Sequence, residues 1–339
     1  MDDFEQHSMK IKIAQFGLGP IGLETVKLAA TRTWAEIIGA IDIDPLKRGQ
    51  DLAQLTGTKS LRGRPVYGDF EELLRDAKPD IVLHTTVSRF KDAFAQIEPM
   101  VQNGISVISS CEELVFPRLR EPKLARKLDQ LAKATGARVV AAGVNPGFVM
   151  DLLPLCLTGV SCSVRSVHVQ RVVNASTRRA PLQKKIGSGL PPVEFQRSLD
   201  QGKAGHAGLK ESLALVAHAL SWKPEEVTET AEPVVAERLI ETGHFTVKKG
   251  ETCGIHQAVQ GKIGGKVRLS LDIKMYLDAP DPRDSIQIEG EPPLSVVIKG
   301  GVAGDQATVA SLVNTVSRLL HAPPGLLLIT DLPVPRLAV

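Results

Sequence analysis

A glycine-rich run, Gly17-Leu18-Gly19-Pro20-Ile21-Gly22, follows directly after the apolar stretch Ile11–Phe16 and leads into a helical pattern over Ile21–Ala30. Between a strand and a helix, the first glycine permits a tight turn, the second lets backbone amides approach a pyrophosphate, and the third allows close helix packing. The helix N-terminus adds partial positive charge. The run therefore predicts a dinucleotide-binding unit, with the cofactor at Gly17, Gly19, Pro20, Ile21 and Gly22.

An acidic residue ends the next predicted strand, Glu36–Asp42, twenty positions after Gly22. A carboxylate at this place accepts hydrogen bonds from the ribose hydroxyls in the adenosine half of the cofactor. The nearby acids disfavour a 2′-phosphate, whereas the basic pair that follows favours one, so NAD is the expected cofactor and NADP remains the alternative. The residues expected around the ribose are Asp42, Ile43, Lys47 and Arg48.

Short apolar runs alternate with helical stretches as far as Met150, which is the pattern of βαβ units and a parallel sheet. The predicted strands are Ile11–Phe16, Glu36–Asp42, Ile81–Thr85, Ser106–Ser110 and Arg138–Ala142, and the predicted helices are Ile21–Ala30, Phe90–Asn103 and Pro122–Thr135. Beyond Met150 the strands lengthen and alternate in polarity, which predicts an antiparallel sheet interrupted by a helix over Leu209–Leu220. The strands predicted there are Ser166–Val173, His244–Lys248, Ala258–Ile263, Lys266–Tyr276 and Leu294–Ile298.

These patterns predict an α/β fold, with an N-terminal Rossmann domain built on a parallel sheet and a second α+β domain with a mainly antiparallel sheet. Two domains suit a chain of 339 residues. The expected domains are residues 9–150 for NAD(P), residues 151–304 for substrate and dimerisation, and residues 305–339 for a C-terminal helix and tail that return to the Rossmann domain.

The composition excludes several classes of protein. There are 41 Lys and Arg against 38 Asp and Glu, and no dense basic stretch suggests a nucleic-acid partner. No apolar run is long enough to span a bilayer, and residues 1–8 are acidic and polar, unlike a secretory leader. The four cysteines form no CxxC pair and the histidines lack metal-ligand spacing, so we expect a cytoplasmic protein without a metal site or membrane partner.

Polar side chains follow the third, fourth and fifth predicted strands, at the edge where ligands gather in an open parallel sheet. Glu112 and Glu113 follow the fourth strand, close to the expected nicotinamide. Adjacent carboxylates there suit general-base work on a substrate ammonium group. Acids also favour the first turn of a helix, so a structural role for the pair is an equally open interpretation. The other residues expected at the cofactor are His84, Thr85, Thr86, Cys111, Asn145 and Pro146.

Three strings stand out in this region and beyond it: Ser110-Cys111-Glu112-Glu113-Leu114 with Pro117, then Gly143–Asp151, then Asn174–Arg179 with Gln183–Gly187. Together they resemble the 2,4-diaminopentanoate dehydrogenase family, to which native amine dehydrogenases belong. Gly205–Leu209 and Glu211-Ser212 extend the likeness, which covers nearly the whole chain. The broader fold relative is dihydrodipicolinate reductase.

The resemblance implies NAD(P)H-dependent interconversion of a small amine with a ketone or aldehyde plus ammonia, with a glutamate of the Cys-Glu-Glu string as the base. More distant dehydrogenases of similar plan carry a Glu-Lys-Pro string here with a catalytic lysine, and that analogy aligns the base with Glu113. Glu112 remains the alternative. The resemblance also implies a substrate pocket in the second domain, and a homodimer is expected because two-fold dimers are the commonest oligomers. The expected pocket residues are Phe148, Arg178 and His206.

Two other functions stay open at this point. A reductase of a cyclic imine, as dihydrodipicolinate reductase is, shares the plan, although the paired-histidine and lysine pattern of that enzyme is not evident here. A regulatory protein that binds NAD(P) without turnover would keep the glycine run but would have no need of adjacent glutamates. The pair Glu112 and Glu113 is therefore the feature that separates an amine dehydrogenase from a nucleotide sensor.

Overall fold

The computed structural model describes residues 10–338, which form two compact units. The first unit holds the chain up to Val144 together with the segment from Gly304 onward, and the second holds Asn145–Ala303. Residues 1–8, and residue 9 with which the expected first domain begins, lie outside the described part of the chain. Each unit is described by itself below.

The first unit is built on a seven-stranded sheet in which every neighbouring pair of strands is parallel, as predicted. Strand β1 lies between β2 and β4, so the chain order reverses beside it, and this is where open parallel sheets bind ligands. In spatial order the strands are β15 (Gly325–Leu327), β6 (Arg138–Ala141), β5 (Ser106–Ser109), β4 (Ile81–His84), β1 (Ile11–Phe16), β2 (Ala35–Ile41) and β3 (Val66–Tyr67).

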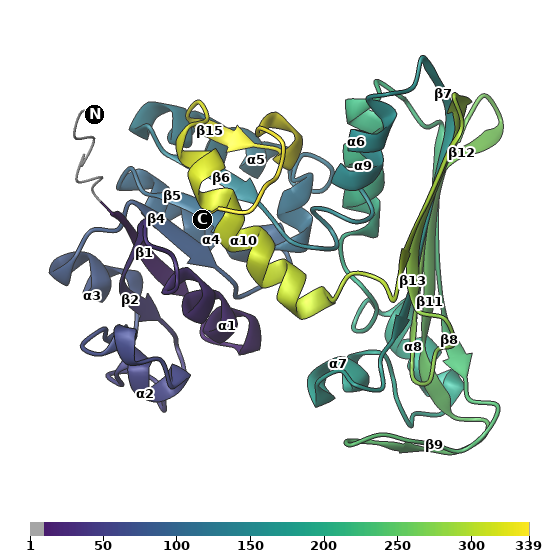
Figure 1. Ribbon diagram of the computed structural model, residues 1–339, viewed down its shortest axis with the longest axis horizontal. Helices are drawn as coiled ribbons and strands as arrows, with labels where there is room; N and C mark the ends of the chain where they lie inside the picture. The colour runs from purple at the N-terminus through teal and green to yellow at the C-terminus, as the bar shows by residue number, and fades with distance from the viewer. Residues whose placement is uncertain (1–9, 339) are drawn as a thin grey trace, which may run out of the picture. The chain divides into compact units, whose positions relative to one another are not determined.

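Helices connect these strands and cover the sheet (Figure 1). Strands β4 and β5 are buried along their whole length, so their sequences, Ile-Val-Leu-His and Ser-Val-Ile-Ser, show no alternation of buried and exposed positions. The C-terminal helix α10 packs against α1 and also contacts β5. The helices are α1 (Pro20–Ala29), α2 (Leu52–Thr56), α3 (Phe70–Asp76), α4 (Phe90–Gln102), α5 (Pro122–Thr135) and α10 (Gly304–Leu320), with 3₁₀ helices at Lys59–Leu61, Glu112–Val115 and Ile329–Asp331.

The second unit is built on a six-stranded mixed sheet. Its neighbouring strands are antiparallel except for β7 and β12, which run parallel, so the expected mainly antiparallel sheet is confirmed. In spatial order the strands are β14 (Leu294–Lys299), β13 (Arg283–Glu291), β7 (Ser163–Asn174), β12 (Lys266–Tyr276), β11 (Thr252–Ile263) and β8 (Glu226–Val235). The prediction that His244–Lys248 is a strand of this sheet is wrong. Only Thr246–Val247 (β10) is extended, and it pairs with β9 (Ile240–Glu241) in a separate two-stranded sheet.

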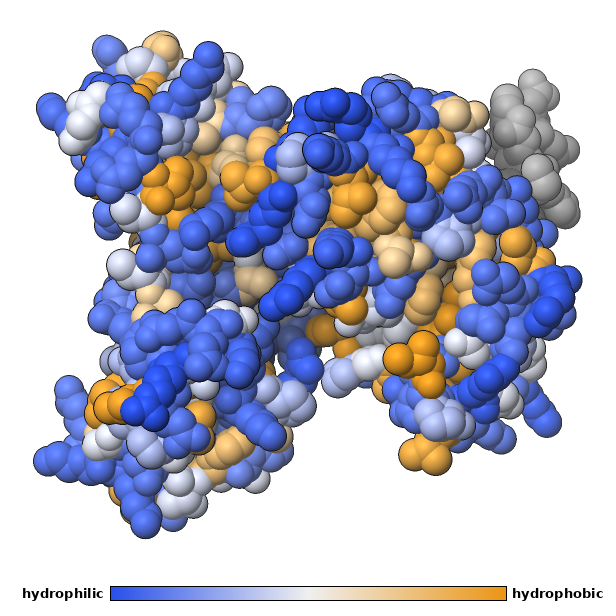
Figure 2. All heavy atoms as spheres, turned by 180° about the vertical axis from the view of Figure 1, so that it is seen from behind, coloured by the Kyte–Doolittle hydropathy of each residue, from blue (hydrophilic) through white to orange (hydrophobic). Residues whose placement is uncertain are grey.

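Helices α6 (Leu152–Thr158), α8 (Pro192–Asp200) and α9 (Leu209–Ala219) pack on one face of this sheet, and α7 (Ala180–Lys185) lies in the loop region after β7 (Figure 1). The two faces of the sheet differ in exposure, since buried residues alternate with more exposed ones along β13, and half-buried residues alternate with exposed ones along β14. Figure 2 shows hydrophobic groups scattered over a mainly hydrophilic surface on the face that it displays. Among residues 10–338 no helix has the length and apolar character needed to cross a membrane.

Candidate active site

The glycine turn after β1 has the geometry that a dinucleotide requires. Gly17 has φ +89°, and a Cβ added there would lie 2.8 Å from the carbonyl oxygen of Thr85. A Cβ on Gly22 would lie 1.8 Å from the carbonyl oxygen of Gly17, so the start of α1 can approach β1 closely only without a side chain. A Cβ on Gly19, the residue before α1, would meet nothing within 4 Å. Gly17 and Gly22 are therefore required by packing, whereas Gly19 leaves open space at the helix N-terminus.

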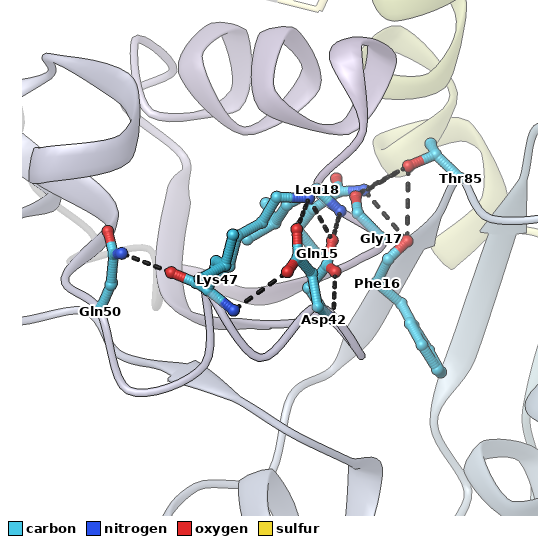
Figure 3. A network of polar contacts seen from close by, with 10 residues as sticks. Gln15, Phe16, Gly17, Leu18, Asp42, Lys47, Gln50 and Thr85 are labelled. Carbon is cyan, nitrogen blue, oxygen red and sulfur yellow. Dashed lines mark hydrogen bonds and ion pairs between the residues drawn. The ribbon is translucent and has the colours of Figure 1, made fainter.

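The buried side chain of Gln15 stabilises this turn by hydrogen bonds (Figure 3). The Gln15 side-chain amide donates hydrogen bonds to the carbonyl oxygen of Gly17 at 3.0 Å and to Oγ1 of Thr85 at 2.8 Å. The Thr85 hydroxyl in turn donates to the Gly17 carbonyl at 3.1 Å. The expected cofactor residue Thr85 thus supports the turn. The sequence prediction missed Gln15, whose signal was a polar residue just before the glycine run, in the apolar second half of the strand.

Asp42 ties the end of β2 to the same turn. Its carboxylate accepts the backbone N–H of Leu18 at 2.6 Å and that of Asp44 at 2.9 Å, and Lys47 Nζ lies 3.3 Å from Oδ2 (Figure 3). The next residue, Ile43, is 86% exposed, which leaves its apolar side chain free to lie under an adenine ring. Of the remaining turn residues, Pro20 is exposed and Ile21 is half-buried.

The two basic residues after Asp42 have different partners. Lys47 faces Asp42 and also lies 3.5 Å from Asp44, whereas Arg48 forms an ion pair with Glu72 on α3. The sequence groups Lys47 and Arg48 together, but the structure separates their charges. Glu72 carried no sequence signal, because it stands in a helix first turn where an acid is common.

His84, at the end of β4, is fully buried, and both of its ring nitrogens are used within the first unit. Nε2 lies 2.7 Å from Oε1 of Gln96, and Nδ1 lies 2.8 Å from Oγ of Ser109. Since Gln96 Oε1 is an acceptor, we assign the ring proton to Nε2 and the acceptor role to Nδ1. Burial lowers the pKa of His84 to about 4, so the ring is neutral at pH 7. Its neighbour Thr86 is exposed, and the Thr86 hydroxyl also bonds to Gln96.

The hydrogen bonds of His84 reach the Cys-Glu-Glu string through Ser109. The Ser109 hydroxyl oxygen accepts the backbone N–H of Cys111 at 3.0 Å. Burial raises the pKa of the Cys111 thiol to about 12, so this residue stays a protonated, inert packing group at neutral pH. His84 and Cys111, both expected to contact the cofactor, therefore lie inside the unit and order the loop that carries the glutamates.

Glu112 and Glu113 open the 3₁₀ helix that follows β5, and both are half-buried. The Oε2 atom of Glu113 accepts the backbone N–H of Phe90, the first residue of α4, at 2.9 Å. Its Oε1 atom lies 3.4 Å from Nε of Arg120. Glu113, which follows β5, thus caps α4, the helix that follows β4, and this contact gives its carboxylate a structural role.

In the second unit, the segment that begins at Asn145 is ordered by a buried acid. The Asp151 carboxylate accepts the backbone N–H groups of Gly147 at 2.8 Å and Leu152 at 2.6 Å, and the Ser212 hydroxyl at 2.7 Å. Burial raises the pKa of Asp151, and these hydrogen bonds lower it by a smaller amount. The Asn145–Pro146 peptide bond that begins this segment is cis. Both polar atoms of the Asn145 side chain are buried without a hydrogen-bond partner among the described residues.

His206 lies in a cationic part of the second unit. Burial, followed by the charges of Lys185 and Arg171, lowers the pKa of His206 to about 3, and a hydrogen bond to the Asn145 backbone acts in the opposite direction. Its Nε2 atom is buried and has no partner among residues 10–338. Burial lowers the pKa of Arg171, and the charge of Arg178 also lowers it, whereas the carboxylate of Asp284 raises it. The predicted residues His206, Arg178 and Asn145 therefore share one region, to which the structure adds Arg171 and Lys185.

Phe148, the remaining predicted pocket residue, is half-buried, and its carbonyl oxygen accepts the backbone N–H of Leu153 at 2.8 Å. The described part of the chain contains no group of three or more His, Cys, Asp or Glu side chains that could hold a metal ion. The two sets of candidate residues thus comprise a glycine turn with a neighbouring glutamate loop, and a separate group of cationic and unpartnered polar side chains.

Comparison with known proteins gives one consistent family. The model of the 2,4-diaminopentanoate dehydrogenase C-terminal domain matches residues 148–339. A 2,4-diaminopentanoate dehydrogenase from Acetoanaerobium sticklandii is 30% identical over 96% of this chain and 94% of its own length. An amine dehydrogenase from Streptomyces virginiae is 24% identical over 96% of both chains.

Two solved structures share the fold. An amine dehydrogenase from Mycobacterium smegmatis superposes with a TM-score of 0.87 at 23% identity, covering 98% of both chains. A dihydrodipicolinate reductase from Paenisporosarcina sp. TG-14 superposes with a TM-score of 0.53 at 13% identity, covering 93% of this chain and 97% of the other. The α/β fold expected from the sequence is confirmed by both.

Proposed function

This chain belongs to the 2,4-diaminopentanoate dehydrogenase family, and we propose that it is an NAD(P)H-dependent amine dehydrogenase that interconverts a small amine with a ketone or aldehyde plus ammonia. One observation carries the proposal: the glycine turn after β1 and the glutamate loop after β5 belong to one parallel sheet, in which only β4 separates β1 from β5. Carboxyl ends of parallel strands face the same edge, so a cofactor bound at the turn places its reactive ring near that loop.

The residues of the first unit fit a dinucleotide. The open space at Gly19 admits a pyrophosphate to the N-terminus of α1, and the carboxylate of Asp42 stands at the ribose position. We favour NAD over NADP because the positive charge of Lys47 is already offset by Asp42 and Asp44. When bound, the nicotinamide supplies or accepts the hydride at the substrate carbon.

Glu112 is the residue that we propose as the base. We propose a positioning role for Glu113, because its two carboxylate oxygens face the Phe90 amide and Arg120. In the reductive direction, Glu112 takes a proton from the nitrogen as ammonia adds to the carbonyl carbon and passes it to the former carbonyl oxygen. A second proton, from solvent, lets that hydroxyl leave as water, which forms the iminium ion and leaves Glu112 as a carboxylate. A negative carboxylate stabilises that cation until hydride transfer gives the amine. In the opposite direction, Glu112 takes the proton from the amine.

The substrate class that the second unit favours is an amine that also carries a carboxylate. Arg171 is 3% exposed and its Nε lies 3.5 Å from Oδ1 of Asp284, but its Nη1 atom is buried without a partner among the described residues. Arg178 adds positive charge near Arg171, and Lys185 adds positive charge near His206. The unpartnered Nε2 of His206 and the amide of Asn145 offer neutral hydrogen-bonding groups beside these charges. Buried polar groups gain partners when a matching ligand binds, and 2,4-diaminopentanoate, the compound named in the family, is a ligand of this chemistry.

Two further properties complete the proposal. The face of the six-stranded sheet that α6, α8 and α9 leave uncovered provides a surface for a two-fold homodimer (Figure 1). The four cysteines are free, which suits a reducing compartment such as the cytoplasm.

The test is NAD(P)H oxidation measured with small ketones and keto acids in concentrated ammonium buffer. Mass spectrometry of the products must show the corresponding amine. Omission of ammonium is the control, since a simple carbonyl reductase consumes NAD(P)H without it. Cofactor oxidation that does not depend on ammonium for any substrate contradicts amine formation.

A further inference from the structure

The ion pair between Arg48 and Glu72 bears on which nicotinamide cofactor this protein prefers. Arg48 is the second basic residue after Asp42, and a 2′-phosphate on the adenosine ribose is generally bound by an arginine near this position. In the structure the Arg48 guanidinium is already paired with the Glu72 carboxylate, from helix α3. Arg48 would therefore have to leave Glu72, or share it, in order to meet a phosphate.

Glu72 is held in place independently of Arg48. Its Oε2 atom accepts the backbone N–H of Gly68 at 2.8 Å, and its own backbone N–H is capped by the Asp69 side chain at 2.8 Å. Its side chain is 24% exposed, whereas that of Arg48 is 56% exposed. The Glu72 carboxylate is therefore held in place by its own hydrogen bonds, and the Arg48 side chain extends to it.

Gly68 makes this arrangement possible. A Cβ at Gly68 would lie 2.5 Å from Nε of Arg48, so the arginine side chain crosses the backbone where no side chain stands. The absence of a side chain at Gly68 therefore leaves room for Arg48 to reach Glu72 on α3.

The charges near the ribose position also oppose a phosphate. Lys47 is matched by Asp42 and Asp44, and Arg48 is matched by Glu72, so three carboxylates stand against two cations. A 2′-phosphate would bring further negative charge into this group and would find each cation already engaged. The ribose hydroxyls of NAD bring no such charge.

We propose that Glu72 is a specificity-determining residue, which disfavours NADP by holding Arg48 away from the 2′ position of the ribose. Glu72 acts through Arg48 and does not touch the reacting atoms. The inference rests on the proposed function only in placing the adenosine ribose at Asp42.

The experiment is calorimetric binding of two fragments, 5′-ADP and 2′,5′-ADP, to the full chain. Glu72→Gln keeps an oxygen that can accept the Gly68 amide but removes the ion pair and one negative charge. We expect the affinity for 2′,5′-ADP to rise about fivefold relative to 5′-ADP, which is the scale of one exposed ion pair. The gain should shrink at high salt, because exposed charges are screened.

The matched control is Glu71→Gln, which removes the same charge from the exposed preceding residue of α3. Its affinity ratio should stay close to that of the wild type. A second variant, Glu72→Gln combined with Arg48→Gln, should lose the gain, because the released arginine is what binds the phosphate.

Equal ratios for Glu72→Gln and Glu71→Gln overturn the proposal, and so does a gain that persists without Arg48. Failure of the cofactor site itself gives a different result, since the wild type then binds neither fragment. Binding of both fragments by the wild type with an unshifted ratio in Glu72→Gln rejects the role of Glu72 alone.

Discussion

The carboxylate of Glu113 accepts the backbone N–H of Phe90 at 2.9 Å, so a residue from the loop after β5 caps the helix that follows β4. A carboxylate at a helix N-terminus satisfies an otherwise unpaired amide and interacts favourably with the helix dipole. This contact gives Glu113 a role in positioning the loop, and we propose Glu112 for proton transfer.

We therefore expect Glu112→Gln to lower kcat by about a hundredfold or more, with cofactor affinity nearly unchanged, because glutamine cannot accept a proton. The acid limb of the pH–rate profile should disappear in this variant. Steady-state kinetics over a pH series and calorimetric binding of NADH measure both effects.

At position 113, the variant Glu113→Gln should retain much of the stability that Glu113→Ala loses. Glutamine can still accept the Phe90 amide, whereas Glu113→Ala leaves it uncapped, at a cost of about 1 kcal/mol in stability. Both variants should keep the acid limb. A hundredfold loss of kcat in Glu113→Gln, with its melting temperature unchanged, would instead identify Glu113 as the base.

The glycines of the turn should separate stability from binding. Gly19→Ala should fold normally, because its Cβ meets nothing within 4 Å, but it should weaken NADH binding by narrowing the space for the pyrophosphate. Gly22→Ala should destabilise the first unit by about 1–3 kcal/mol or more, since its Cβ would lie 1.8 Å from the Gly17 carbonyl oxygen. Thermal melting and calorimetry distinguish the two, and unimpaired NADH binding by Gly19→Ala would argue against a pyrophosphate at this position.

His84 should make stability fall in mild acid. Its folded pKa of about 4 lies below the ordinary value of 6.5, so the unfolded chain binds the proton more readily between these values. The stability is therefore fully present above pH 6.5 and is lost as the pH falls towards 4, by up to about 1.4 kcal/mol per pH unit. In His84→Asn, the slope of the unfolding free energy against pH should decrease by the amount that one bound proton contributes. Denaturant unfolding between pH 4 and 7 measures this slope. An unchanged slope would show that His84 is not the group responsible.

Lys185 and Lys184 offer a matched pair for testing the substrate class. Both are exposed residues at the end of α7, but only Lys185 acts on the pKa of His206. Lys185→Gln should raise KM for a keto acid about fivefold and leave a neutral ketone unaffected, since one partly screened charge contributes about 1 kcal/mol. Lys184→Gln should change neither. Equal effects on keto acid and neutral ketone would mean that Lys185 does not face a carboxylate.

Local patterns predicted much of the first unit correctly. Strand β1 and helix α5 have the predicted bounds, and the glycine run stands at the predicted strand-to-helix turn. Strand β8 was not predicted, because its sequence is mostly polar and exposed and has no apolar alternation. It is extended because it pairs with β11 across the sheet, which no local pattern reveals.

By itself, the sequence determined the dinucleotide turn and the alternation of strands and helices that makes a parallel sheet, because both depend on residue patterns along short segments. It also carried the strings by which the chain resembles the family. Only the tertiary structure decided that Glu113 caps α4, that His84 is sealed between Gln96 and Ser109, and that Arg48 belongs to Glu72. These partners are separated by 12 to 25 positions along the chain. Each such side chain has several chemically suitable partners in the sequence, and the packing of the sheet and its helices brings only one of them within hydrogen-bonding distance.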